Sequence, residues 1–185
     1  MDNQAVKTFN DVRTAPELVW LGIDFTKVRL VGPAGFSDVN SIIRVQIHSM
    51  NDLWVKEPHK YNFPKFTGKT ARTRLDLVYQ HNMQIPIDGL ILVQDTPGRI
   101  NEGVVQEVVN ECKFPQDNLI GMMFVAESLD KNQAAAFVWV TFVDLNNSKV
   151  ILTSKYAGRA GGIGFRNYWA NAFFDIFRQM PTILR

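Results

Sequence analysis

The chain has 185 residues and a mass of 21.1 kDa, which is enough for one well-buried core and short for two. Hydrophobic residues make up 46% of it and charged residues 21%, so global disorder is not expected. The 20 Lys and Arg residues against 18 Asp and Glu give a formal net charge of +2, spread along the chain. This distribution disfavours nucleic-acid binding, which needs a clustered basic face. We therefore expect a single domain over residues 1–185.

The cysteine content and the N-terminus bear on location. Cys112 is the one cysteine, so no intramolecular disulfide can form, and its helix-like surroundings favour a small buried hydrophobe over a reactive thiol. No run reaches the ~18 apolar residues of a membrane helix. Residues 1–17, MDNQAVKTFNDVRTAPE, lack the apolar core of a signal peptide. Two locations stay open: the cytoplasm, or a compartment reached with a leader removed from the mature chain.

The first strand is predicted after a polar lead-in, residues 1–16, which we expect to be loosely held. Residues 18–31 (LVWLGIDFTKVRLV) are rich in branched and aromatic side chains whose period of two shifts phase near Thr26 and Lys27. This pattern predicts a long strand with a bulge or bend in its middle. Residues 32–35 (GPAG) end the strand.

A helix and an aromatic loop follow. Ser37 or Asp38 can cap a helix that runs to about Lys56. Its expected buried stripe is Ile43, Ile47, Met50 and Trp54. Residues 58–70 are expected to form an ordered loop packed by Tyr61, Phe63 and Phe66. The alternative is a binding loop that uses these aromatics together with Lys60, Lys65 and Lys69.

The middle of the chain is less regular. Residues 72–79 (RTRLDLVY) are predicted to form a second strand. Residues 87–93 (IDGLILV) fit either a short buried strand or a loop that inserts apolar side chains. Residues 95–98 form a turn, and residues 101–111 are predicted to form a helix.

The C-terminal part has a cleaner rhythm. Residues 119–126, 135–145 and 149–156 are predicted strands joined by short polar turns, which indicates an antiparallel meander. Apolar residues at helical spacing then predict an aromatic helix over residues 164–180. The expected order is β-α-β-α-β-β-β-α. We therefore predict an α+β domain with a mainly antiparallel sheet and about three helices packed on one face of it.

No catalytic or metal-binding motif stands out. His48, His59 and His81 are far apart, and none has a carboxylate or cysteine at metal-ligand spacing. No Gly-x-Ser-x-Gly, Ser-x-x-Lys or Cys/His arrangement is present. The sequence predicts no enzyme activity, no cofactor and no metal.

The glycine-rich stretch before the last helix is the strongest candidate for a functional site. Its glycines, Gly158, Gly161, Gly162 and Gly164, together with Arg159 and Arg166, could form an anion cradle of backbone N–H groups and guanidinium groups. The stretch follows an antiparallel hairpin strand, however, and it matches no phosphate-binding motif. A tight step of the chain beneath an aromatic helix is the favoured interpretation. Asn167 and Asn171, one turn apart, are candidates for a binding surface.

The stretches WLGIDFTKVRLVG and GRAGGIGFRNYWA resemble a group of uncharacterised bacterial proteins of about this size. The resemblance implies export to the cell envelope and no assigned activity. More loosely, residues 143–145 (VDL) and 150–152 (VIL), followed by a glycine-rich step into a helix, are similar to the closing part of domains related to the TolB N-terminal domain and the curli-secretion lipoprotein. That likeness concerns the fold alone.

Two functions follow from these observations as hypotheses. The first is a non-enzymatic envelope or periplasmic domain that binds another protein or assembles with itself. The alternative is the binding of a small anion or a nucleotide-type ligand at residues 158–166.

Overall fold

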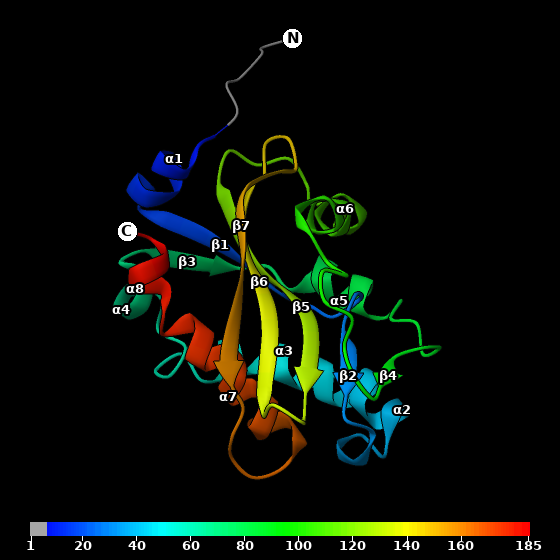
Figure 1. Ribbon diagram of the computed structural model, residues 1–185. Helices are drawn as coiled ribbons and strands as arrows, with labels where there is room; N and C mark the ends of the chain where they lie inside the picture. The colour runs from blue at the N-terminus through cyan, green and yellow to red at the C-terminus, as the bar shows by residue number, and fades with distance from the viewer. Residues whose placement is uncertain (1–6) are drawn as a thin grey trace.

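The computed structural model describes residues 7–185 (Figure 1). The strands are β1 (Glu17–Asp24), β2 (Arg29–Val31), β3 (Thr70–Thr73), β4 (Ile91–Leu92), β5 (Ile120–Asp130), β6 (Ala135–Asp144) and β7 (Lys149–Arg159). The helices are α1 (Phe9–Thr14), α2 (Val39–Ser41), α3 (Ile47–Lys56), α4 (Phe63–Thr67), α5 (Asp76–Asn82), α6 (Glu102–Cys112), α7 (Phe165–Phe177) and α8 (Met180–Ile183). A 3₁₀ turn occupies Pro33–Gly35, and a π-helical turn, Ile42–Gln46, joins α2 to α3.

The strands form one mixed sheet around β5. Four of the six strand pairings in the described chain are parallel: β1 with β3, β1 with β5, β2 with β4 and β2 with β5. The meander of β5, β6 and β7 is antiparallel, as predicted. The expected α+β class with a mainly antiparallel sheet is therefore wrong, and the domain is of the α/β type. Parallel neighbours need a crossover connection, which the helices between β1 and β3 supply.

Helices cover both faces of the sheet, whereas one covered face was expected. Alternate side chains of β5 enter two separate cores: Met122 and Phe124 point toward α3 and α7, while Met123 and Val125 point toward α6. In Figure 1, α5 and α6 lie to the right of β5, β6 and β7, and α7 lies to the left of these strands and below. Because β5 is buried on both faces, it is apolar without interruption from Ile120 to Ala126.

The long first strand predicted over residues 18–31 is two strands, β1 and β2, and the predicted irregularity near Thr26 is the interruption between them. β1 pairs with β5 up to Asp24, opposite Val125, and β2 resumes the pairing at Arg29, opposite Ser128. The partner strand has a register shift in the same place, between Ala126 and Ser128. We call the interruption at residues 25–28 the strand break. It lies beside the middle of β5, at the point where the parallel strand β1 ends.

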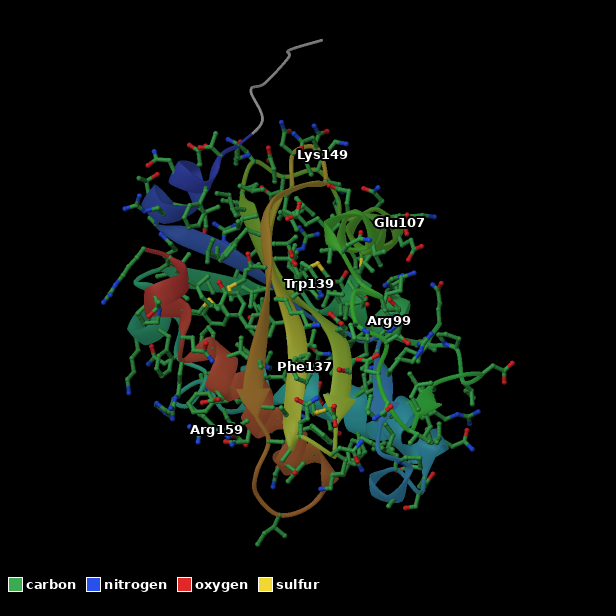
Figure 2. All side chains as sticks on the ribbon, in the orientation of Figure 1. Arg99, Glu107, Phe137, Trp139, Lys149 and Arg159 are labelled. Carbon is green, nitrogen blue, oxygen red and sulfur yellow. The ribbon has the colours of Figure 1, made fainter. Side chains whose placement is uncertain are left out.

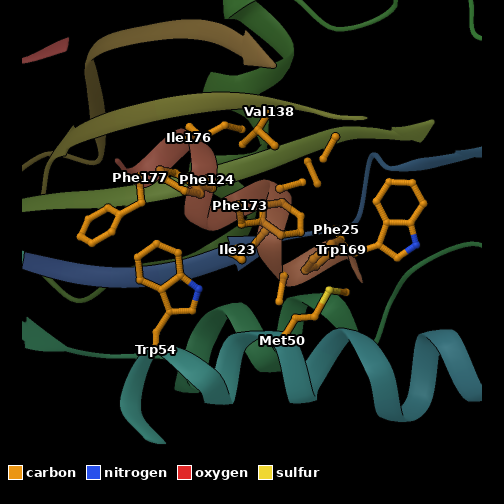
Figure 3. Close-up of a cluster of buried hydrophobic side chains, with 14 of the residues drawn as sticks. Ile23, Phe25, Met50, Trp54, Phe124, Val138, Trp169, Phe173, Ile176 and Phe177 are labelled. Atoms are coloured by element: carbon orange, nitrogen blue, oxygen red, sulfur yellow. The ribbon is translucent and has the colours of Figure 1, made fainter. Parts of the chain in front are cut away.

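The aromatic helix α7 anchors the larger core, as its spacing predicts. Phe173 and Phe177 are fully buried, and the ring of Trp54 from α3 lies 4.8 Å from Phe177 and 4.2 Å from Trp20 of β1. Figure 3 shows Trp54 and Met50 rising from α3 toward this cluster. The helix ends at Phe177, earlier than the predicted residue 180, and α8 follows after a short turn.

Two local predictions in the middle of the chain need correction. The strand expected at residues 72–79 ends at Thr73, and residues 76–82 form α5. Leu75 and Val78, three positions apart, pack on Gly22 of β1, which is helical spacing rather than strand spacing. The stretch 87–93 contains the two-residue strand β4, which pairs with β2 in parallel.

The N-terminal lead-in and the aromatic loop are both more ordered than their composition implies. Residues 1–6 lie outside the described chain, but the rest of the lead-in is not loosely held, because α1 forms and its Val12 is fully buried. The loop at residues 58–70 contains α4, and Tyr61 and Phe63 are buried in the larger core, as expected for a packed loop. Among the described helices, none is both long and apolar enough to cross a membrane.

Candidate functional site

The first residue of the glycine-rich stretch, Gly158, lies in close contact with α7. Gly158 lies on β7 directly beneath α7, where a Cβ atom would come within 2.0 Å of the carbonyl oxygen of Ala172. Gly162 and Gly164 have positive φ angles of 109° and 79°, which favour glycine. At these two positions the chain turns and enters α7. This agrees with the favoured interpretation of the stretch as a tight structural step.

The polar residues of this stretch bind their neighbours instead of meeting in a pocket. The backbone N–H of Arg159 donates to the carboxylate of Asp175 at 3.0 Å, so an acid already occupies that donor. The side chain of Asn171 lies 3.5 Å from the Arg159 carbonyl oxygen, and the Arg166 guanidinium donates to Asn167. A hollow of about 270 Å³ contains Arg166 and Asn167 but neither Arg159 nor Asn171. The structure does not bring the predicted anion site together.

Two buried side-chain amides, from α3 and α5, bind the backbone at the end of β1 and the start of the strand break. Asn51 of α3 accepts from the N–H of Ile23 at 2.7 Å and donates to its carbonyl at 3.0 Å. Asn82 of α5 accepts from the N–H of Phe25 at 2.7 Å and donates to the Ile23 carbonyl at 2.9 Å. Both asparagines are fully buried, so they replace the ladder bonds that the end of β1 does not make within the sheet.

Four side chains from three elements gather at the end of β1. Asp24 ends the strand, His81 lies on α5, and Glu111 and Cys112 end α6. The His81 Nδ1 atom is 2.6 Å from Asp24 Oδ2 and 3.6 Å from Cys112 Sγ. On the other side of the ring, Nε2 is 3.2 Å from Glu111 Oε2. Asp24, His81 and Cys112 are at most 5% exposed, so the group lies inside the protein.

The charges of this group follow from its geometry. The hydrogen bond with Asp24 raises the pKa of His81 against the opposing effect of burial, and the Glu111 carboxylate raises it further. Burial raises the pKa of the Cys112 thiol, and the same two carboxylates add to that rise. His81 therefore holds a proton between two acids while Cys112 stays a neutral thiol. This is not the arrangement of an activated cysteine nucleophile, which needs a stabilised thiolate.

A basic pocket of about 340 Å³ opens on the Nε2 side of His81. Its cationic side chains are Lys27 of the strand break, Arg29 at the start of β2 and Arg99 in the loop before α6. Arg99 donates to the carbonyl oxygens of Lys27 and Glu127 at 2.7 and 2.6 Å, and so bridges the strand break to the register shift in β5. Burial lowers the pKa of Arg29, and the nearby Arg99 guanidinium lowers it further. Like charges are thus held close together in one pocket.

A larger hollow of about 690 Å³ lies at the carboxyl ends of β2 and β5, but its acids are already paired. Glu127, at the register shift and 1% exposed, accepts from the Trp139 indole and the Lys155 ammonium, both at 2.7 Å. Asp130 accepts from the backbone and the side chain of Gln133. In Figure 2, Arg99 lies to the right of Trp139, and Arg159 lies lower and to the left, at the end of β7. These carboxylates are satisfied within the protein.

Sequence reasoning missed the residues around the strand break. His81 was expected to lack ligand-type partners, which is wrong, because folding places Asp24 and Cys112 against its ring. Positions 24, 81 and 112 are too far apart for a spacing motif to reveal them. The prediction that Cys112 is buried is confirmed at 4% exposure. A scan against protein-family models found no match, and a search of curated proteins found no similar protein.

Proposed function

We propose that the chain binds a small anion, a phosphate- or carboxylate-bearing molecule, in the basic pocket at the strand break. The observation that carries the proposal is the position of Arg29. Its guanidinium lines the pocket and donates to the carbonyl of Val28, and no carboxylate of residues 7–185 lies within ion-pair distance of it. Asp95 acts on Arg29 only from beyond ion-pair distance, and a half-buried arginine without a direct acidic partner is stabilised by a ligand that supplies negative charge.

The charge balance of the pocket supports an anion over a cation. Lys27, Arg29 and Arg99 face it, while Glu111 is the one acid among the residues that line it. Glu111 is itself engaged by Lys27 at 3.6 Å and by His81. The planar fork of a guanidinium matches the geometry of phosphate and carboxylate oxygens.

The position in the fold supports the same function. In open α/β sheets, ligands bind outside the carboxyl ends of parallel strands, where the strand order changes. The pocket shares one part of this description, because it lies at the carboxyl end of the parallel strand β1, where β2 takes over the pairing with β5 along the same edge. The small-anion hypothesis is therefore kept, but its site moves from residues 158–166 to the strand break.

The test is a thermal-shift titration with inorganic phosphate at constant ionic strength, which keeps general screening equal. At ten times the dissociation constant, binding stabilises the native state by about 1.4 kcal/mol, or roughly 3–6 °C in Tm for a chain of this size. Arg29→Gln is expected to abolish the shift and Arg29→Lys to reduce it. The matched control, Arg166→Gln, removes an exposed arginine of the glycine-rich stretch and is expected to leave the shift intact. A full shift in Arg29→Gln, or its loss in Arg166→Gln, would overturn the proposal.

A second candidate function is protein binding or self-assembly, as the resemblance to envelope proteins implies. The edge of the sheet favours it, because β7 pairs with β6 alone among the described strands. Side chains cover both ends of this edge: Gln106 binds Val150 and Ser148, and Asp175 binds Arg159. Residues 151–156 remain available for strand addition by a partner.

Light scattering coupled to gel filtration tests this second function for self-association. A dimer that Thr153→Pro converts to a monomer would support pairing through β7, because the N–H of residue 153 points away from β6 and proline cannot donate to a partner's sheet ladder. A strictly monomeric protein across the concentration range would remove the self-assembly form of the hypothesis.

A further inference from the structure

We propose that Asp24, His81 and Cys112 form a binding site for a divalent transition-metal ion of the zinc class. The ligand atoms would be Asp24 Oδ2, His81 Nδ1 and Cys112 Sγ. The three residues place their ligand atoms within 4.8 Å of one another, and all three are buried. This site goes beyond the anion pocket and does not depend on it, because the metal would lie on the Nδ1 side of the ring while the pocket lies on the Nε2 side.

The separation between Cys112 and His81 fits tetrahedral coordination, and the separation between Asp24 and His81 needs an adjustment. With Zn–S near 2.3 Å and Zn–N near 2.0–2.1 Å, tetrahedral angles place sulfur and nitrogen about 3.6 Å apart. The Cys112–His81 separation is 3.6 Å. The same geometry places nitrogen and oxygen about 3.3 Å apart, whereas Asp24 and His81 share a hydrogen bond at 2.6 Å. The metal would replace the shared proton, and the carboxylate would move away by about 0.7 Å.

The surrounding groups orient the ligands as an outer shell does. Glu111 accepts from His81 Nε2 at 3.2 Å, which leaves Nδ1 as the nitrogen for the metal, as in carboxylate–histidine–zinc arrangements. The backbone N–H and the hydroxyl of Thr26 hold Asp24 Oδ1 at 2.9 and 2.6 Å, so that Oδ2 faces the ring. Asp24 and His81 are thus oriented toward each other before any ion binds.

The donor set selects the class of ion. One thiolate, one imidazole and one carboxylate suit Zn²⁺ or Co²⁺, whereas Mg²⁺ and Ca²⁺ require oxygen ligands. The charge of the ion stabilises the Cys112 thiolate that the two carboxylates otherwise disfavour. Binding therefore releases the protons of Cys112 and His81, and three protein ligands leave the fourth position to water or to a ligand.

Titration of the chelator-treated protein with Co²⁺ tests the site, because a cobalt–thiolate bond gives a near-ultraviolet charge-transfer band. We expect one equivalent of Co²⁺ to produce the band and Zn²⁺ to displace it. Cys112→Ser is expected to remove the band, and Glu111→Gln to weaken binding by about 10–100-fold while the band remains. His59→Gln, which changes an exposed histidine, is the control and should bind as the wild type does.

The outcome separates this site from the anion pocket. Absence of the thiolate band in the wild type, or equal Co²⁺ affinity in wild type and Cys112→Ser, would overturn the metal site. Circular dichroism of each variant confirms that it is folded, and Glu111→Gln, which keeps all three ligands, tests the geometry even where Cys112→Ser does not fold. Because the phosphate titration uses chelator-treated protein, failure of one proposal leaves the other standing.

Discussion

Substitution of Gly158 by alanine tests whether the glycine-rich stretch is a structural contact. A Cβ atom at this position would lie 2.0 Å from the carbonyl oxygen of Ala172 and 2.8 Å from Cγ1 of Ile176. Non-bonded heavy atoms need roughly 3.5 Å, so α7 would have to move away from β7 by about 1.5 Å. Both residues belong to the helix that fills the larger core, so the movement would disturb packed aromatic side chains.

The expected cost is large for a single added methyl group. Overpacking of a well-packed core costs roughly 1–3 kcal/mol, and it costs more where backbone rather than a flexible side chain must give way. We therefore expect Gly158→Ala to lower the free energy of unfolding by about 3 kcal/mol or more. Gly161→Ala is the matched control, because its Cβ would meet nothing closer than the Asn171 amide at 3.6 Å and its φ angle is not positive.

Urea denaturation followed by tryptophan fluorescence measures both variants. The account predicts a clear loss for Gly158→Ala and a change within about 0.5 kcal/mol for Gly161→Ala. A Gly158→Ala protein as stable as the wild type would refute the close contact between β7 and α7. Equal destabilisation by both substitutions would mean that the whole stretch, rather than one approach, needs glycine.

Two further predictions concern buried polar groups. Asn51→Ala leaves the buried N–H of Ile23 without its acceptor, so it should lower the free energy of unfolding by about 1–3 kcal/mol in the same urea assay. Asn171→Ala removes an exposed contact of 3.5 Å and should change the free energy of unfolding by less than about 0.5 kcal/mol. Similar effects of the two substitutions would contradict the structure. Asp144 is buried, which by itself raises its pKa, but hydrogen bonds from Lys7 and from the backbone of Asn146, together with the charge of Lys7, outweigh burial and lower that pKa below its ordinary value. The ionised Asp144 therefore contributes fully to stability above about pH 4, and this contribution is lost as the pH falls further. In Asp144→Asn, the free energy of unfolding should fall less steeply with decreasing pH below about pH 4. An unchanged dependence on pH would contradict the lowered pKa of Asp144.

Local pattern predicted most elements because their signals lie within a few residues. Asp38 and Asn101 cap helices, accepting from Ser41 and Val104 as their residue types favour. The phase shift near Thr26 correctly located the strand break. Strand partnership is different, because it depends on which distant segments meet. The meander was found since its turns are short, while the parallel pairing of β1 with β3 and β5 crosses long helical connections that no local pattern encodes.

One feature of the sequence, the apolar stretch that forms β5, could have predicted the fold class. The apolar character of β5 from Ile120 to Ala126 indicates burial on both faces, which in turn requires helices on both sides of the sheet. The valine stripe of α6 and the aromatic stripe of α7 are the two helical faces that provide this cover. Assigning them to opposite faces would have predicted an α/β arrangement.

The candidate site could not be predicted from spacing. Asp24, His81 and Cys112 meet because a parallel strand ends where two helices also end, and Arg29 joins them because the strand resumes after a break. Each residue has an ordinary structural explanation in its own segment, so the constellation exists only in three dimensions. The glycine-rich stretch drew attention through its composition, yet its glycines serve packing and turning.

We propose that the functional site lies at the strand break. Amide chemical-shift mapping by NMR with inorganic phosphate, on chelator-treated protein, distinguishes this site from the glycine-rich stretch. We expect perturbations to concentrate at residues 26–29 and around Arg99, with the backbone of residues 158–166 unchanged. Perturbations confined to residues 158–166, or none at millimolar phosphate, would contradict it.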